Sequence, residues 1–193
     1  MSRRFLTRED GAATIEFVVV FLVFIAIIFF VMETALYMFF TASLEKAAQA
    51  GVRAAVVSGP LVAGLPPEIV KTKNGIYGRK CSEQTSGVST HCIPFATQRC
   101  GAAPLTACLE PGFTRILDHM RGFNANIQAA YVTVVYQDIG LGFAGGPTTP
   151  MVTVTISGVP FQTGIVGLLL TNANVLAALP ERSASMTGED LAL

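Results

Sequence analysis

The first feature of the chain is a long apolar segment that follows a short polar stretch. Residues 17–32 carry no charged and no polar side chain, and fourteen of these sixteen residues are Phe, Val, Ile or Leu. Apolar residues therefore cover every face of a helix, which is typical of a segment in lipid. At roughly −0.3 to −0.6 kcal/mol per residue, insertion into a bilayer gains about 4 to 8 kcal/mol. The pattern predicts a membrane-spanning helix, in preference to a soluble core helix or a cleaved signal peptide.

The helical pattern continues well beyond this span. The chain has no proline before Pro60, and the part after residue 40 is rich in alanine, a strong helix former. We predict one helix over 12–58, with the span at about 12–33. Ala47, Gly51 and Ala55 recur every four residues, which lets another structure approach the helix closely. The spacing suits either a second helix or the chain's own globular domain.

The remaining chain predicts a small domain. A linker rich in proline and glycine is expected at 59–74, and the domain at 75–193. A short amphipathic helix is expected at 111–123, strands at 130–138 and 151–157, and a last strand at 181–189. Several glycines between the first two strands favour antiparallel pairing, whereas 164–179 suits either helix or strand. The predicted fold class is α+β, a long N-terminal helix followed by a domain with an antiparallel sheet.

Composition agrees with a membrane-attached protein. Hydrophobic residues make up 51% of the chain and charged residues 13%, about half the share of a typical soluble chain. The 13 basic and 13 acidic residues balance, so nothing points to a nucleic-acid partner. Arg3, Arg4 and Arg8 precede the span, which predicts a cytoplasmic N-terminus with the domain outside.

The four cysteines lie in the predicted outer domain. They are Cys81, Cys92, Cys100 and Cys108, and an even count in an oxidising compartment indicates disulfides. Three pairings are possible, and we favour the neighbours, 81–92 and 100–108. His91 beside Cys92 raises a zinc site as the alternative. The cysteines are eight to eleven residues apart without a C-x-x-C motif, so we predict no metal.

No catalytic motif is present in the sequence. There is no G-x-S-x-G, H-E-x-x-H, P-loop or dinucleotide fingerprint. Of the two histidines, His119 is expected at the surface or its boundary. We predict a protein that is not an enzyme and that uses no cofactor and no small-molecule substrate.

The most specific motif stands at the start of the span. A short basic leader ends at Gly11, Glu16 follows five residues later, and Phe17 begins the apolar run. This pattern resembles the precursors of type IV pilins, and "GAATIEFVVVFLVF" is similar to the TadE-like pseudopilins of the tight-adherence (Tad, or Flp) pilus system. That family has Gly before the cleaved bond, then Glu and Tyr at the fifth and sixth mature positions; here Phe17 replaces the tyrosine. Gly51 and Arg53 also match the family, and "MRGF" and "SASMTGED" are similar to its outer domain.

The resemblance implies a function and a set of partners. A prepilin peptidase would cut between Gly11 and Ala12, so that residues 1–11 are a leader peptide. The mature protein would be a minor pilin or pseudopilin in the bacterial inner membrane, with its C-terminal domain in the periplasm. Its partners would be the membrane, other pilin or pseudopilin subunits and the Tad assembly machinery. The alternative is an unprocessed, membrane-anchored structural or binding protein of the envelope.

Elementary electrostatics suggests a role for Glu16 near a newly exposed N-terminus. Cleavage would leave a charged amine on Ala12 at the membrane boundary, one helical turn from the carboxylate of Glu16. An unpaired charge in a medium of low dielectric is costly, so the amine and the carboxylate favour pairing, within one subunit or between neighbours. From Ala12 to Met32 is 21 residues, about 32 Å as a helix and close to the thickness of a bilayer core.

Overall fold

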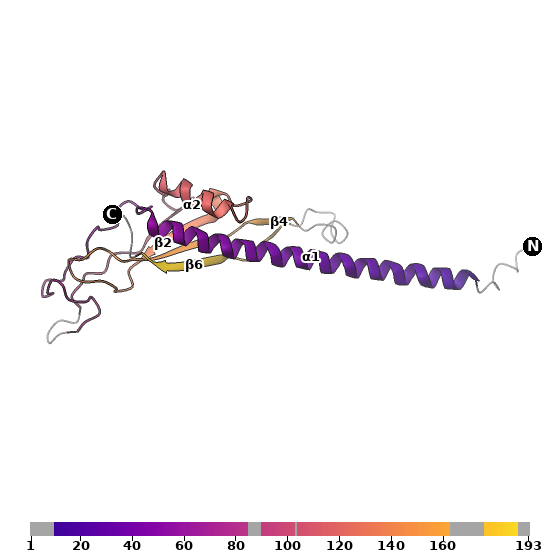
Figure 1. The fold of residues 1–193 in the computed structure, drawn as a ribbon, viewed down its shortest axis with the longest axis horizontal. Coiled ribbons are helices and arrows are strands. Elements are labelled where there is room, and N and C mark those ends of the chain that lie inside the picture. Colours follow the sequence, from indigo (N-terminus) through magenta and orange to yellow (C-terminus); the bar gives the residue numbers. More distant parts are fainter. Residues whose placement is uncertain (1–9, 85–89, 103, 163–175, 189–193) are drawn as a thin grey trace, which may run out of the picture. The chain divides into compact units, whose positions relative to one another are not determined.

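The computed structural model describes residues 10–84, 90–102, 104–162 and 176–188, and Figure 1 labels the elements. The chain divides into two compact units. One comprises Met1–Phe39 and Pro160–Ala177, and the other comprises Phe40–Val159 and Ala178–Leu193. Each is described separately below.

Helix α1, Asp10–Val57, is the longest element, with 48 residues. It passes from the first unit into the second, and its C-terminal part, residues 40–57, belongs to the second unit. The predicted long apolar helix is confirmed. Its C-terminal part is not a bare extension before the domain, because this part of α1 is itself one of the packed elements of the second unit.

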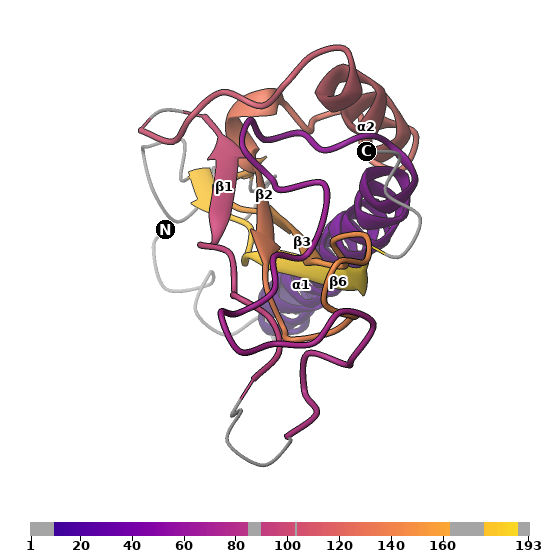
Figure 2. The ribbon, with the colours of Figure 1, turned by 90° about the vertical axis from the view of Figure 1, so that its left-hand side faces the viewer.

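The second unit contains a four-stranded antiparallel sheet, which confirms the α+β fold class (Figure 2). The strand order is β1-β2-β3-β6, with bounds Gln98–Gly101, Val132–Gln137, Met151–Ile156 and Arg182–Thr187. The strands β2, β3 and β6 lie at the three places that the alternation of residues predicts. Strand β1 and a 3-10 turn at Ala129–Tyr131 were not predicted. A separate pair consists of β4 (Pro160–Gln162) and β5 (Leu176–Ala178). Strand β5 lies in the segment 164–179 that the sequence left ambiguous, whereas β4 precedes that segment and was not predicted.

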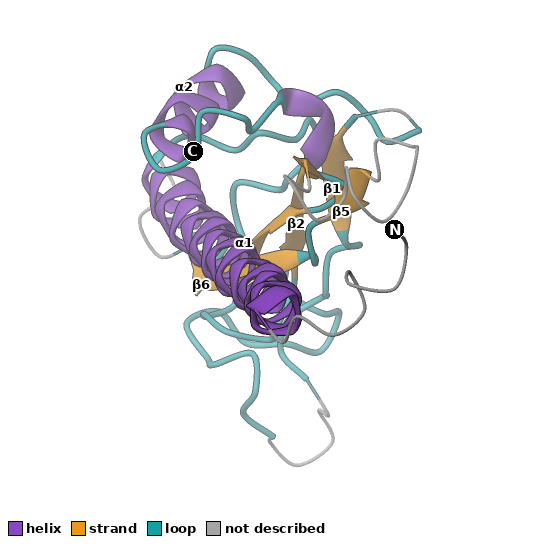
Figure 3. Cartoon of the chain, turned by 90° about the vertical axis from the view of Figure 1, so that its right-hand side faces the viewer, coloured by secondary structure: helices purple, strands orange, loops and turns teal. Residues whose placement is uncertain are grey.

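One face of this sheet forms the core. Alternate residues of β2 and β3 are buried there, and the register places them directly opposite each other: Val132 and Ile156, Val134 and Val154, Tyr136 and Val152. Helix α2, Gly112–Arg121, buries Phe113, Ile116, Leu117 and Met120, the apolar face that its sequence predicts. Figure 3 shows α2 and the part of α1 that belongs to the second unit on the same side of the sheet.

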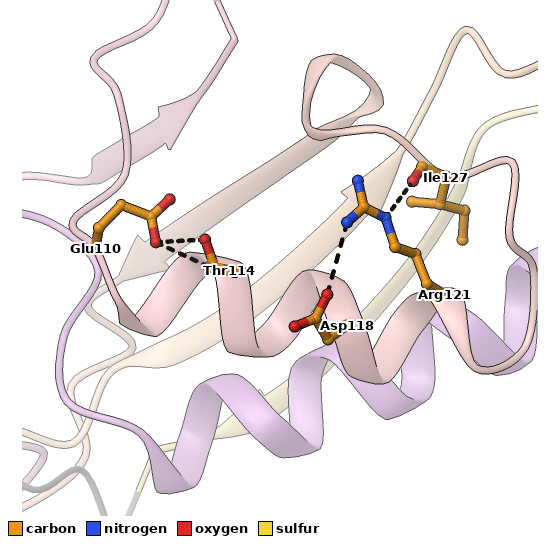
Figure 4. Close-up of polar contacts among 5 residues, drawn as sticks. All are labelled: Glu110, Thr114, Asp118, Arg121 and Ile127. Atoms are coloured by element: carbon orange, nitrogen blue, oxygen red, sulfur yellow. Dashed lines mark hydrogen bonds and ion pairs between the residues drawn. The ribbon is translucent and has the colours of Figure 1, made fainter.

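Polar contacts hold the two ends of α2 (Figure 4). At its start, the Glu110 carboxylate accepts hydrogen bonds from the backbone N–H and the hydroxyl of Thr114, at 3.1 and 2.7 Å. At its end, Arg121 Nε donates to the Ile127 carbonyl at 3.1 Å, and its guanidinium lies 3.6 Å from the Asp118 carboxylate. These contacts fix the loop that leads from α2 into β2.

At Gly51, α1 approaches both α2 and the sheet closely. A Cβ added at Gly51 would lie 2.8 Å from Met120 Sδ and 3.3 Å from Val154 Cγ1, so helix, α2 and sheet meet at this residue. Ala47 and Ala55, one turn before and after, are completely buried. Of the two readings of this spacing, the structure shows the small residues packed on the chain's own domain.

A buried tyrosine joins the end of α1 to the sheet. Tyr136 on β2 is fully buried, and its hydroxyl oxygen accepts the Leu61 backbone N–H at 3.2 Å. Burial raises the pKa of Tyr136 above its ordinary value of 10.0, and the hydrogen bond from Leu61 lowers it in part. The neutral phenol is therefore the form that the folded domain favours.

The first prediction concerns Gly51. Replacing Gly51 with Leu should reduce the free energy of unfolding by about 1–3 kcal/mol, because the site has no room for the side chain. Denaturant unfolding of the full chain in detergent micelles measures this loss. The exposed Gln49→Leu is the matched control and should change stability by no more than about 0.5 kcal/mol. Equal stability of Gly51→Leu and the native chain would contradict the packing at this residue.

The second prediction concerns alkaline pH. Since the pKa of Tyr136 is raised on folding, its contribution to stability is complete below pH 10 and is lost as the pH rises through the folded-state value. The Tyr136→Phe variant should lose about 1–3 kcal/mol at pH 7, because the Leu61 N–H is left without its acceptor. Unfolding curves between neutral pH and pH 11 test both effects. We expect the variant to approach the native stability above pH 10; a constant difference would argue against this role.

Candidate functional site

The candidate site is the N-terminal part of α1. Gly11 and Ala12 have helical backbone in its first turn, and Glu16 and Phe17 follow with exposed side chains. Ala12 and Glu16 are four residues apart, so they share a face of the helix. The ring of Phe17 stacks on that of Phe21 at 6.0 Å. The arginines of the predicted leader lie outside the described residues.

The side chains that follow form an apolar cylinder. Thirteen large hydrophobic residues from Phe17 to Met32 are 38–68% exposed. Leu36, Met38 and Phe39 continue this exposed apolar surface along the helix. In the described part of the chain, α1 is the one helix long and apolar enough to cross a membrane. Water would make such exposure very unfavourable, whereas lipid does not.

This cylinder is not uniform around its circumference. Ile25, Phe29 and Glu33, spaced by four residues, are partly covered, whereas the other residues from Phe17 to Met32 are exposed. One turn beyond Glu33, Tyr37 meets Phe161 of β4 edge to face, with ring centroids 5.6 Å apart, and both residues belong to the first unit. Phe161 is buried. One face of α1 is therefore covered by the chain itself.

Glu16 lies on the other side of α1. Nine residues separate Glu16 from Ile25, which is two and a half turns at 3.6 residues per turn. The exposed Val20, Ile27 and Val31 lie near Glu16 on this open face. The carboxylate is thus on the side of the helix that the chain leaves uncovered.

All four cysteines form disulfides in the pairing that the sequence favoured, Cys81–Cys92 and Cys100–Cys108. The second disulfide folds a loop back on β1, where Gly101 N–H donates to the Thr106 carbonyl at 2.9 Å. His91 is completely buried, and its Nδ1 accepts the Ile76 backbone N–H at 3.3 Å. The thiols that a zinc site would need are thus used in disulfides, and His119 is exposed.

The described residues of the domain contain no group of three His, Cys, Asp or Glu side chains suited to a metal. A shallow cavity of about 310 Å³ lies next to the Cys81–Cys92 disulfide. Asp138 is the titratable residue in its lining, and its carboxylate accepts the backbone N–H groups of Phe95 and Gly140, at 3.2 and 2.7 Å. The hydrogen bond from Phe95 joins the segment before β1 to the loop after β2, and that from Gly140 lies within this loop.

Comparison with known proteins agrees with the N-terminal motif. Residues 11–53 match the family model described as TadE-like protein, so the resemblance predicted from the sequence is confirmed for this segment. The match begins at Gly11 and ends at Arg53, and it contains Glu16 and Gly51. Neither the curated proteins nor the solved structures gave a match to this chain. The match supports a pilin-type protein that is associated with the Tad pilus.

Sequence reasoning missed the two-sided character of α1. The run from Phe17 to Met32 is apolar on every face, so its pattern could not show which face the chain covers. Glu33 and Tyr37, one turn apart, gave a weak signal, because both carry polar groups on one side of an otherwise apolar helix. Their covered face became visible only with β4 in place.

Proposed function

We propose that this chain is a minor pilin or pseudopilin that helps to assemble a Tad-type pilus after a prepilin peptidase has removed residues 1–11. The observation that carries the proposal is the combination of Gly11, Glu16 and the apolar helix within the TadE-like segment. A plain anchor needs only the apolar run. In the proposed function, Gly11 precedes the bond that the peptidase cuts, and Glu16 pairs with the amine that the cut exposes.

The assembly step rests on pairing of charges at the membrane boundary. Removal of the leader exposes the amine of Ala12, and Glu16 supplies a carboxylate near it. The open face of α1 presents Glu16, with Val20 and Ile27, to a neighbouring helix. An amine and a carboxylate in a poorly polar environment are stable mainly when they pair, so subunits at the same depth favour each other.

The proposed location is the bacterial inner membrane, with a single span. The leader arginines would keep the N-terminus in the cytoplasm, and the domain with its two disulfides would lie in the oxidising periplasm. The disulfides Cys81–Cys92 and Cys100–Cys108 suit that compartment. The proposed partners are the prepilin peptidase, other pilin or pseudopilin subunits and the Tad assembly machinery.

The second candidate is an unprocessed, membrane-anchored binding or structural protein. The packed outer domain would serve it equally well, and the lack of a use for Glu16 counts against it. Both candidates are structural roles, and we propose no catalytic activity for either.

Processing is tested at the N-terminus. In a host that has the prepilin peptidase, intact-mass and peptide spectrometry of the membrane fraction should find Ala12 as the first residue. Replacing Gly11 with Leu should leave the leader attached, because the peptidase has lost the residue before the bond. The matched control is Ala13→Leu, which keeps both residues of the bond and should still be cut. A native chain that still starts at Met1 or Ser2 would refute the processing.

Assembly is tested at Glu16. The Glu16→Leu variant should insert in the membrane as the native chain does, but piliation should fall by about tenfold or more, since the Ala12 amine lacks its partner. Electron microscopy and quantification of sheared pili measure the effect. The exposed Glu45→Leu, in the C-terminal part of α1, is the control for loss of a negative charge. Normal piliation of Glu16→Leu would remove the pairing from the mechanism.

A further inference from the structure

The loops around the Cys81–Cys92 disulfide form an exposed apolar surface. Six large hydrophobic residues in these loops are 45–69% exposed: Val70, Ile76, Tyr77, Ile93, Leu141 and Phe143. We name these six residues the loop patch. They come from chain segments that precede β1 and from the connection between β2 and β3, and Figure 2 shows those loops at one end of the sheet. An exposed apolar cluster of this kind marks an interaction surface.

Backbone contacts hold the patch together. The Ile93 N–H donates to the Val70 carbonyl at 2.7 Å, so these two residues are neighbours. Phe143 forms a β-bridge with Lys80, and Gly145 packs against the ring of Tyr77. The Cys81–Cys92 disulfide joins the segment that contains Tyr77 to the segment that contains Ile93. The patch is therefore a built surface of three loops.

A cavity opens within the loop patch. Its volume is about 310 Å³, and Val70, Ile93 and Leu141 line it together with Phe95. Apolar residues at its rim are exposed by half, so the cavity opens at the surface of the patch. A flexible apolar chain fits such a hollow better than a flat, rigid partner does.

Positive charge surrounds the patch. Lys71, Lys73 and Lys80 lie in the same loops, and within the described residues none has a carboxylate within 4.0 Å. Lys71 Nζ lies 5.3 Å from the centre of the Tyr77 ring, a cation–π contact.

The acidic groups of these loops are mostly engaged. Glu83 pairs with Arg79 at 2.6 Å, and the carboxylate of Asp138 accepts two backbone N–H groups. Glu68 is the remaining carboxylate of this region and forms no salt bridge in the part of the chain that is described. Lys71, Lys73, Arg79 and Lys80 are four positive charges against the three negative charges of Glu68, Glu83 and Asp138, so these loops carry a net charge of +1, which favours anions.

We propose that the loop patch docks on an anionic lipid bilayer. Its apolar side chains would enter the interfacial layer, and the ammonium groups of Lys71, Lys73 and Lys80 would meet the lipid headgroups. Lysine has a long apolar stem and keeps its charge at the headgroup level, which suits this arrangement. Protein interfaces are depleted in lysine, which favours a lipid over a protein partner. This docking is independent of leader processing and of Glu16.

The test uses the full chain reconstituted in nanodiscs of phosphatidylcholine. Flotation with vesicles of phosphatidylcholine, with or without phosphatidylglycerol, measures docking. We expect binding to the vesicles that contain phosphatidylglycerol, and weakening of that binding by added salt. Each Lys→Gln change at Lys71, Lys73 or Lys80 should reduce binding about fivefold, and Tyr77→Ser with Phe143→Ser should abolish it.

Matched controls lie elsewhere on the same unit. Lys46→Gln on α1 and Phe123→Ser beyond α2 remove an exposed lysine and an exposed aromatic ring, and both should bind as the native chain does. Unchanged thermal unfolding checks that each variant is folded. Equal binding to both kinds of vesicle, no binding, or binding that the patch variants leave intact would overturn the proposal. Equal capture on polyglutamate-coated beads would also overturn it, by showing charge attraction without lipid.

Discussion

The whole domain depends on the close approach of α1 to the sheet at Gly51. Because this residue has no side chain, Met120 of α2 and Val154 of β3 can both reach the helix backbone. Complete burial of Ala47 and Ala55 extends the contact over two turns. The C-terminal part of the apolar helix α1, residues 40–57, is thus also part of the folded core of the second unit.

The same helix carries two different surfaces in its apolar half. The face with Ile25, Phe29 and Glu33 is partly covered, and one turn beyond Glu33 the ring of Tyr37 contacts Phe161 of β4. The opposite face, with Glu16, is open. A helix that is apolar all round has no preferred partner in lipid, since tails and side chains are equally apolar. Because one face of α1 is partly covered and the other carries the Glu16 carboxylate, a neighbouring helix has a preferred face of α1 to contact.

The two disulfides have different roles in the domain. At β1, the loop closed by Cys100–Cys108 folds back and supplies a backbone partner, which blocks that edge from pairing with another chain. The Cys81–Cys92 disulfide instead holds long loops that have few buried residues of their own. Covalent closure and backbone hydrogen bonds stabilise these loops, and their large apolar side chains remain exposed at the surface.

Sequence by itself determined a large part of this protein. The apolar run, the alternation in β2 and β3 and the apolar face of α2 are local patterns, and each led to the correct element. The Gly11–Glu16 spacing also predicted the TadE-like match, because a processing motif is read along the chain. Tertiary structure alone decided that Gly51 packs on α2 and the sheet, and that the Ile25 face of α1 is covered. These contacts join residues far apart in sequence, and small or uniformly apolar residues carry no local signal of what they will touch.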